Sequence, residues 1–260
     1  MGRELEIISS RKNYRVRIMR ELVKSAEYRR ETDLFVVEGD HLCGELADCA
    51  DNIEYFLYTE RAAEKYPETV RKASEKSFDT AVITEELSEY ISDTKSPQGL
   101  FAAAERLGSP ILEGARRLVV LDGVQDPGNV GTMIRTAEAF GFDGVLYSPN
   151  CADVFTPKTL RASMGSVFRV PTQFYSGTEN LRGWLRGFTV FGAMLDESAM
   201  RLGEVKFPEK TAVVIGSEGR GISPEVAAIC DEKIYIPIKG AESLNAAMAA
   251  AIIMWELRRS

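Results

Sequence analysis

Short apolar runs alternate with longer amphipathic stretches in the first part of the chain. Each run has the length of a strand, and the intervals between the runs are long enough for helices. The four runs are Leu34–Glu38, Tyr55–Thr59, Ala81–Thr84 and Leu100–Ala104. This alternation predicts a small α/β domain over residues 1–106. Residues 107–116, which follow, are punctuated by Gly, Ser and Pro and indicate a linker.

The pattern changes from Arg117 onward, where the strand-length runs are apolar at nearly every position. These runs are Leu118–Leu121, Gly144–Tyr147, Val190–Leu195, Ala212–Ile215 and Ile234–Ile238. Strands that are apolar on both faces are typical of a parallel sheet covered by helices on both sides. Helical patterns lie between most of the runs. We therefore predict a second α/β domain over residues 117–260, with a mostly parallel sheet.

Composition adds only broad limits. The chain has 260 residues, enough for one large domain or two smaller ones, and its 45% hydrophobic and 27% charged residues are ordinary for a globular protein. No apolar run approaches the ~18 residues of a membrane-spanning helix, and the first residues lack the apolar stretch of a secretory signal. We expect a cytoplasmic protein without membrane contact.

Residue types that bind metals or act as nucleophiles are sparse. His41 is the single histidine, and the scattered cysteines form no C-x-x-C pair; they are Cys43, Cys49, Cys151 and Cys230. Zinc sites normally draw on closely spaced Cys and His, so we expect no metal ion. A Ser-His-Asp triad would need His41, and no G-x-S-x-G motif accompanies it.

The charge is unevenly distributed. A net charge of −7 and a pI of about 5.1 argue mildly against nucleic acid as a partner. Residues 1–30 nevertheless carry a basic excess, made up of Arg3, Arg11, Lys12, Arg15, Arg17, Arg20, Lys24, Arg29 and Arg30. A local basic surface can bind phosphate on an acidic protein, although a solvated basic helix has the same composition.

One unusual segment follows the first buried strand of the second half, at Leu121–Phe140. The strand ends in a polar loop rich in Gly and Pro, and a helix follows. Ligands of open α/β sheets bind beyond the carboxyl ends of strands, and here Asn129 and Arg135 supply an amide and a guanidinium. The alternative is a plain helix-start loop with a surface arginine. Because no G-x-G-x-x-G motif is present, a dinucleotide-binding fold is not supported.

Two further segments carry unusual residues. In Val213–Ile222, glycines bracket Glu218 after a strand, which allows close approach of a ligand to the backbone or simply a tight turn. In Ile236–Glu256, Ser243 precedes a long Ala-rich helix and is its predicted N-cap. Asn245 is then predicted in the first turn, beside the positive end of the helix dipole.

The three segments read N-x-G-x-x-x-R-T-A, G-S-E-G-x-G and I-P-I-x-G-x-x-S-L-N, in that order. Over residues 117–260 this order resembles the signature motifs of the SpoU family, within the SPOUT methyltransferases. The first half is similar to that family's RNA-binding extension through Phe35–His41 and Ser96–Phe101. In the family, that extension resembles a ribosomal-protein fold.

The resemblance implies an RNA ribose 2′-O-methyltransferase that uses S-adenosylmethionine. It also implies a deep C-terminal trefoil knot, which pattern analysis would never propose, and a homodimer whose active sites share residues across the interface. The implied active-site residues are Asn129, Arg135, Glu218, Ser243 and Asn245. The implied cofactor contacts are Ala193, Gly216, Ile236, Ile238 and Leu244. Ala247 stands where family members commonly have serine.

The chemistry leaves the proton acceptor open. The family proposal assigns this role to the arginine of the first motif, here Arg135, but a guanidinium with a pKa above about 12 normally stays protonated. We prefer the hypothesis that Arg135 clamps a phosphate, and that Glu218 holds Arg135 or a loop amide. A two-part chain with an N-terminal extension resembles family members that act on large-subunit ribosomal RNA, whereas shorter members more often act on transfer RNA; the resemblance thus implies ribosomal RNA as the substrate. A non-catalytic RNA-binding protein and a Rossmann-like metabolic enzyme are the alternatives.

Overall fold

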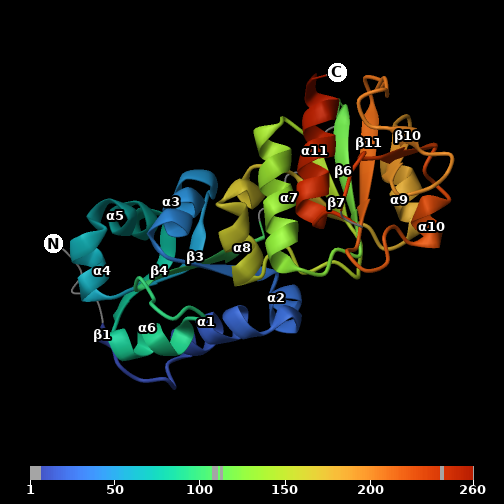
Figure 1. Ribbon diagram of the computed structural model, residues 1–260. Helices are drawn as coiled ribbons and strands as arrows, with labels where there is room; N and C mark the ends of the chain where they lie inside the picture. The colour runs from blue at the N-terminus through green and yellow to red at the C-terminus, as the bar shows by residue number, and fades with distance from the viewer. Residues whose placement is uncertain (1–6, 107–110, 112–113, 241–242, 260) are drawn as a thin grey trace. The chain divides into compact units, whose positions relative to one another are not determined.

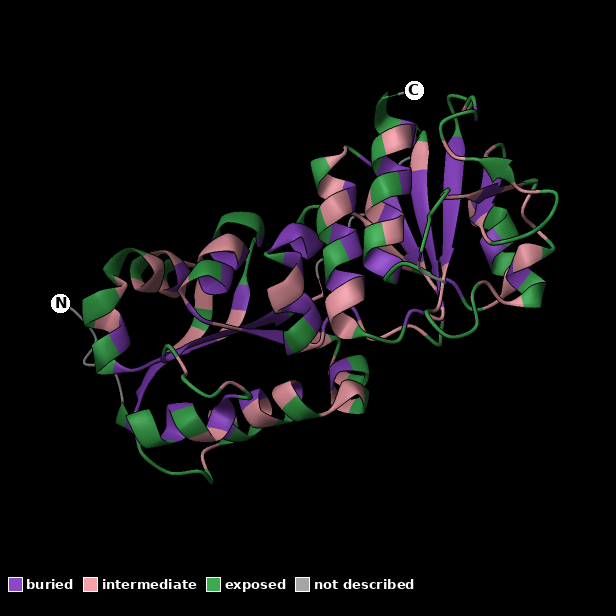
Figure 2. Cartoon of the chain, in the orientation of Figure 1, coloured by how far each residue is buried: buried purple, intermediate pink, exposed green. Residues whose placement is uncertain are grey.

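The computed structural model describes residues 7–106, 111, 114–240 and 243–259. The chain divides into two compact units (Figure 1). The first unit comprises Met1–Leu107 with Phe155–Phe168, and the second comprises Gly108–Val154 with Arg169–Ser260. In both units the strands are largely buried and the helices present one buried stripe, as Figure 2 shows. No helix in the described ranges is long and apolar enough to span a membrane.

The first unit contains a mixed five-stranded sheet in the order β1-β4-β3-β5-β2. Its strands are β1 (Ile7–Ile8), β2 (Leu34–Glu38), β3 (Ile53–Tyr58), β4 (Ser77–Ile83) and β5 (Leu100–Glu105). Its helices are α1 (Tyr14–Lys24), α2 (Ala26–Thr32), α3 (Asp40–Cys49), α4 (Glu60–Lys65), α5 (Pro67–Lys76), α6 (Glu85–Ile91) and α8 (Pro157–Ser163). The four predicted strands are confirmed, and the short strand β1 was not predicted.

Helix α1 shows why this part of the sequence folds as it does. Asn13 precedes the helix and its side chain accepts the backbone N–H of Arg15, which satisfies one free donor of the first turn. Val16, Met19 and Leu22 recur on one face and are fully buried against the sheet. The remaining face carries the basic residues predicted from the sequence.

A segment from the second half of the sequence completes the first unit. The ring of Phe35 lies 5.1 Å from that of Phe155 and 5.7 Å from that of Phe168. Arg161 donates two hydrogen bonds to the carboxylate of Asp93, at 2.7 and 3.0 Å. The packing of this segment on the first unit could not be predicted, because no periodic pattern of hydrophobic residues marks it in the sequence. The predicted linker at residues 107–116, which would separate two functional domains, stays a prediction.

The second unit contains a seven-stranded sheet in the order β10-β12-β9-β11-β6-β7-β8, and every pairing in it is parallel. Its strands are β6 (Arg117–Asp122), β7 (Gly144–Tyr147), β8 (Thr172–Phe174), β9 (Thr189–Ala193), β10 (Met200–Arg201), β11 (Thr211–Gly216) and β12 (Glu232–Tyr235). The predicted parallel sheet is confirmed, while β8 and β10 were not predicted.

Two predicted strands extended too far. Strand β9 ends at Ala193 rather than Leu195, and β12 ends at Tyr235 rather than Ile238. Pro237 has no N–H and cannot continue a ladder in the interior of a sheet. The apolar residues beyond both strand ends therefore lie in loops, where they are available to a ligand.

Helices cover both faces of this sheet. They are α7 (Pro127–Ala139), α9 (Thr178–Trp184), α10 (Pro224–Ala227) and α11 (Ala246–Arg259). Leu118 and Val120 of β6 share a core with Leu181 of α9 and Val226 of α10. Side chains alternate between the faces of a strand, so the intervening residues of β6 face the other side. There α11 lies beside α7 and contacts β11 (Figure 1).

Helix α11 follows β12 in the sequence and returns to the middle of the sheet. The C-terminal trefoil knot implied by the resemblance stays a prediction.

Candidate active site

A cavity of about 420 Å³ opens at the carboxyl ends of β9, β11 and β12. This is the edge at which parallel α/β sheets bind ligands. Residues implied by the sequence resemblance as cofactor contacts all line it; they are Ala193, Gly216, Ile236, Ile238 and Leu244. Glu218 and Ser243 line it as well. The structure thus brings together residues from three separated stretches of sequence.

The lining is mostly apolar. Ile215, Ile234 and Ile253 are buried beneath the cavity, whereas Leu195 and Leu244 are 75% and 37% exposed. Apolar walls with a few polar groups are typical of sites for small organic ligands. The sequence placed Leu195 inside a strand, and its position in the cavity was missed because the strand ends earlier.

The wall formed by the loop after β9 is tied to β12. Lys233 donates to the carboxylate of Asp196 at 2.8 Å, and Ser198 donates to the same carboxylate through its backbone N–H at 2.9 Å. The hydrogen bond from Lys233 is the main cause that lowers the pKa of Asp196. This ion pair holds the loop that contains Leu195 next to the strand end.

Gly216 is required by close backbone packing. A Cβ atom at this position would lie 2.1 Å from the carbonyl carbon of Gly221 and 2.3 Å from the nitrogen of Ile222. The two strands of the loop are held together by reciprocal backbone hydrogen bonds between Ser217 and Gly221, at 3.0 and 2.9 Å. The glycine of the second motif therefore lets the loop double back on itself and carry Glu218 at its tip.

Three of the predicted catalytic residues form one hydrogen-bonded chain. The side-chain oxygen of Asn245 accepts the backbone N–H groups of Ala247 and Met248, at 3.0 and 3.2 Å. Its amide nitrogen must then point away, and it donates to the Asn129 oxygen at 3.1 Å. The Asn129 amide nitrogen in turn donates to the Glu218 carboxylate. The helix backbone thereby fixes the orientation of both amides.

The predicted N-cap of the last helix was wrong. Helix α11 begins at Ala246, and the residue directly before it, Asn245, supplies the capping oxygen. Ser243 lies two residues earlier, exposed and at the cavity. Capping requires the side chain next to the first helical residue, so Ser243 is left free for another role.

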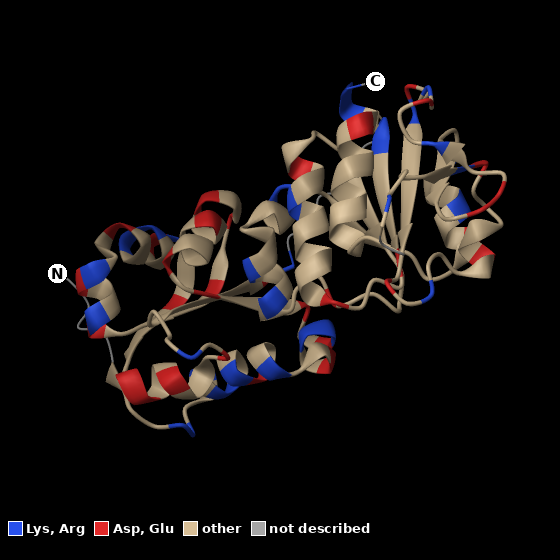
Figure 3. Ribbon diagram, viewed as in Figure 1, with Lys and Arg blue, Asp and Glu red and all other residues tan. Residues whose placement is uncertain are grey.

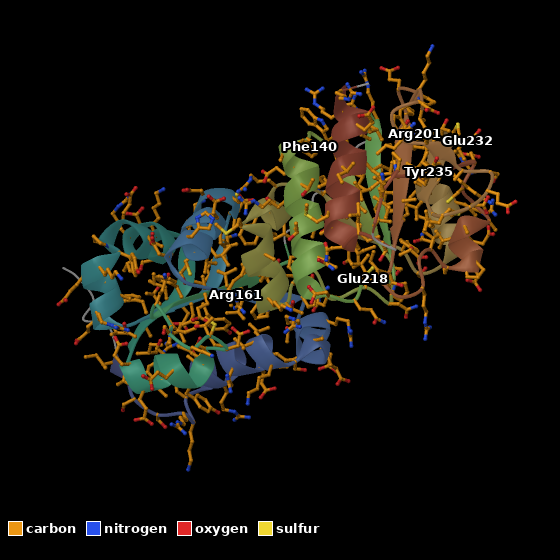
Figure 4. The ribbon with its side chains drawn as sticks, in the orientation of Figure 1. Phe140, Arg161, Arg201, Glu218, Glu232 and Tyr235 are labelled. Carbon is orange, nitrogen blue, oxygen red and sulfur yellow. The ribbon has the colours of Figure 1, made fainter. Side chains whose placement is uncertain are left out.

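Arg135 lies in α7 with an exposed side chain. Within the described residues it forms no hydrogen bond or ion pair. Of the two partners predicted for Glu218, Arg135 or a loop amide, the structure shows the amide: the carboxylate of Glu218 accepts from Asn129 at the start of α7. Figure 4 shows Glu218 near the ends of α7 and α11 at which both helices begin. Neither Arg135 nor Asn129 lines the cavity itself.

Some of the basic residues predicted to form a surface are instead paired with other groups of the first unit. Arg11 and Arg15 pair with carboxylates, Arg20 donates to the backbone, and buried Arg29 donates to the Leu22 carbonyl at 2.6 Å. Four basic residues remain exposed, and their side chains form no hydrogen bond or ion pair in the described ranges: Lys12, Arg17, Lys24 and Arg30. Figure 3 shows basic residues along α1 and α2. Arg3 lies outside the described residues.

Family comparisons cover nearly the whole chain. Residues 116–255 match the model described as the SpoU rRNA Methylase family, and residues 13–102 match an MRM3-like substrate binding domain. A Bacillus subtilis relative, 23S rRNA (guanosine(2553)-2′-O)-methyltransferase RlmP, is 34% identical over 255 residues. The match covers 96% of this chain and 98% of that protein.

Similar solved structures belong to the same class of proteins as these relatives. An AdoMet-bound rRNA methyltransferase from Sinorhizobium meliloti is similar with a TM-score of 0.86 and 29% identity, covering 98% of this chain and 97% of that one. The SpoU methyltransferase AviRb from Streptomyces viridochromogenes, in complex with AdoMet, has a TM-score of 0.82 and 25% identity, covering 95% and 98%. The family match and these relatives together define the class of the protein as an RNA methyltransferase. The chain belongs to the SpoU rRNA Methylase family.

Proposed function

We propose that this chain transfers a methyl group from S-adenosylmethionine to a ribose 2′-hydroxyl of large-subunit ribosomal RNA. The observation that carries the proposal is the hydrogen-bonded chain Asn245–Asn129–Glu218 beside a cavity at the carboxyl edge of a parallel sheet. The B. subtilis relative is named as a 23S rRNA 2′-O-methyltransferase, which supports both the reaction and the RNA class. A cytoplasmic location follows from such a substrate.

The cavity suits the cofactor. Its volume of about 420 Å³ lies in the range of small-molecule sites. Ile236, Ile238 and Leu244 offer apolar surface for a planar base, and the tight turn at Gly216 leaves backbone close to the ligand. S-adenosylmethionine, when bound, supplies the electrophilic methyl group. The protein supplies orientation and electrostatics.

Arg135 is proposed to bind the phosphate next to the target ribose. Its exposed guanidinium has no partner in the described part of the chain and remains free to make a bidentate contact. Such a clamp would hold the 2′-oxygen in line with the methyl group, where positioning alone can supply several kcal/mol of barrier reduction. The hydroxyl proton then leaves to water or a neighbouring group as the new bond forms.

Glu218 is proposed to orient Asn129 rather than to act as the base. Its carboxylate already accepts the Asn129 amide, which is itself oriented by Asn245. Ser243, exposed at the cavity and not used as a cap, remains available for a hydrogen bond to cofactor or ribose.

We further propose a homodimer formed through α11. Met248, Ile252 and Trp255 are 57%, 39% and 54% exposed and recur at spacings of four and three residues along one face of α11. Phe140 packs against Trp255 with ring centroids 5.5 Å apart and ring planes tilted by 52°, and it enlarges the surface. A contiguous apolar surface of this kind marks an interface, and a second copy pairing about a two-fold axis would cover both surfaces.

RNA contact by the first unit is proposed for the exposed basic residues Lys12, Arg17, Lys24 and Arg30. Phosphate contacts of this kind depend steeply on salt. Replacing these four residues together with Gln should weaken RNA binding and flatten its salt dependence, without changing cofactor affinity.

The central experiment combines calorimetric titration with S-adenosylmethionine and transfer of a labelled methyl group. Large-subunit ribosomal RNA and transfer RNA would be compared as acceptors. Arg135→Lys should bind RNA more weakly yet keep near-normal turnover at saturating RNA, and Arg182→Lys in α9 is the matched surface control. A protein that binds RNA but no cofactor would refute the proposal in favour of a non-catalytic RNA-binding protein. Transfer into transfer RNA alone would refute the ribosomal substrate.

A further inference from the structure

Asp122, the last residue of β6, is a buried carboxylate whose partners among the described residues are all neutral. It is 7% exposed. The backbone N–H of Ser223 donates to its Oδ2 at 2.6 Å, and the Tyr175 hydroxyl donates to its Oδ1 at 3.4 Å. No ion pair to Asp122 occurs within the described residues. A buried carboxylate without a cation lowers the stability of a fold. Stability therefore does not explain why an aspartate occupies this position.

The partner of Asp122 stands at the end of the loop that carries Glu218. Ser223 directly follows Ser217–Ile222, and the start of this loop is fixed by the pairing of Gly216 with Asp122 in the β6–β11 ladder. The two ends of the loop are therefore attached to one residue. Asp122 holds the beginning through its place in the ladder and the end through its side chain.

This attachment bears directly on the cavity. Gly216 and Ile222 both line it, and the backbone of Gly216 leaves no space for a Cβ atom against Gly221. If Ser223 moved away, the loop would open and the cavity wall would move with it. Glu218 would also lose its fixed position beside Asn129. The hydrogen bond to Ser223 therefore controls both the pocket and the amide chain.

Tyr175 completes the arrangement. Burial, together with the nearby charge of Asp122, raises the pKa of Tyr175, so its hydroxyl stays protonated and acts as a donor. At 3.4 Å its contact to Asp122 is the longer of the two, which leaves the Ser223 contact as the stronger one. Burial of the tyrosine beside the carboxylate also excludes water from this hydrogen bond.

We propose that Asp122 is a positioning residue for methyl transfer: by accepting the Ser223 N–H, it holds the loop Ser217–Ile222 in the shape that the cofactor cavity and Glu218 require. The inference rests on the proposed function of that cavity. Asp122 does not line the cavity and acts through the loop.

The test uses the full-length protein and measures S-adenosylmethionine affinity by calorimetry without RNA. Asp122→Ala leaves the Ser223 N–H without its acceptor and should weaken affinity about tenfold, the effect of one buried hydrogen bond. Asp122→Asn should restore affinity, because its oxygen can accept from Ser223 while its amide donates to the Tyr175 oxygen. Hydrogen exchange of residues 217–223 should be faster in Asp122→Ala alone.

Two further variants separate positioning from stability. Asp122→Leu has nearly the shape of aspartate but no acceptor for the Ser223 N–H and no buried charge, so it reports on the hydrogen bond even if Asp122→Ala does not fold. Asp143→Ala is the matched control. Asp143 accepts the backbone N–H groups of Arg116 and Arg117, at 2.7 and 2.9 Å, at the opposite end of β6. Its loss should lower the melting temperature and leave cofactor affinity unchanged.

The inference is overturned if Asp122→Ala or Asp122→Leu binds the cofactor like the wild type. It is also overturned if Asp122→Asn is as weak as Asp122→Ala, or if Asp143→Ala loses as much affinity at equal loss of stability. Absence of cofactor binding in the wild type would instead refute the proposed function of the cavity. Normal wild-type binding with unaffected variants would refute only the role of Asp122.

Discussion

Asn245 has two separable tasks, and Asn245→Asp divides them. The side-chain oxygen of Asn245 caps α11, and its amide nitrogen orients Asn129. Aspartate keeps the capping oxygen and adds a negative charge at the helix N-terminus, where the dipole favours it. It has no donor for the Asn129 oxygen, and two oxygens then face each other. The substitution should therefore preserve stability and damage the active site.

The magnitudes follow from the hydrogen bonds involved. Loss of an N-cap costs ~1 kcal/mol, which for a protein of this size corresponds to a melting temperature lower by roughly 2–4 °C. Asn245→Asp should show no such decrease, whereas Asn245→Ala should. Loss of the amide donor removes about 1.4 kcal/mol of oriented interaction, or about a tenfold decrease in rate, and reversal of Asn129 away from Glu218 would add to it.

The assay is single-turnover methyl transfer at saturating cofactor and RNA, measured beside thermal unfolding. Asn245→Asp with a wild-type melting temperature and a rate lowered about tenfold or more supports the division of tasks. A wild-type rate in Asn245→Asp would refute the role of the amide in orienting Asn129. An unchanged melting temperature in Asn245→Ala would refute the cap.

Three other predictions concern separate features. Gly216→Ala should weaken cofactor binding in calorimetry by about tenfold or more, because a Cβ placed 2.1 Å from Gly221 forces the loop open and disrupts its backbone bonds; unchanged affinity would contradict this. Burial raises the pKa of Glu38 above 4.5, so the folded protein favours the protonated side chain. This stabilisation of the fold is fully present below pH 4.5 and is lost as the pH rises through the raised pKa. Glu38→Gln should therefore raise the melting temperature at pH 7 and not at pH 4, and a gain equal at both would exclude the linkage. Trp255→Arg should shift light scattering toward the monomer, whereas Phe78→Arg, also at an exposed aromatic residue, should not.

The sheet of the second unit could be predicted because its strands are buried on both faces. Val119 and Val120 are fully buried neighbours on opposite faces of β6, which is what a continuous apolar run encodes. The ends of β9 and β12 could not be predicted from the same signal, since apolar residues at a ligand site extend the run beyond the strand. The error therefore fell at the functional edge of the sheet.

The members of the site were predicted by resemblance, but their contacts were not. Ser and Asn are equally good N-caps, so the sequence S-L-N did not decide between Ser243 and Asn245. Asn129, which accepts a hydrogen bond from the amide of Asn245, is 116 residues away from it in the sequence. Asp122 was missed for the same reason: it ends an apolar strand like any turn residue, and its partner Ser223 is 101 residues away.

The segment Phe155–Phe168 sets the order in which the protein can be completed during synthesis. Domains generally fold from the N-terminus as the chain emerges. Phe35 emerges early, but the rings that pack on it, Phe155 and Phe168, follow more than a hundred residues later, after β6 and β7 of the other unit. The apolar face of the first unit around Phe35 therefore stays uncovered while this part of the second unit is synthesised. A fragment that ends near residue 106 would keep that face exposed and should aggregate, whatever its affinity for RNA.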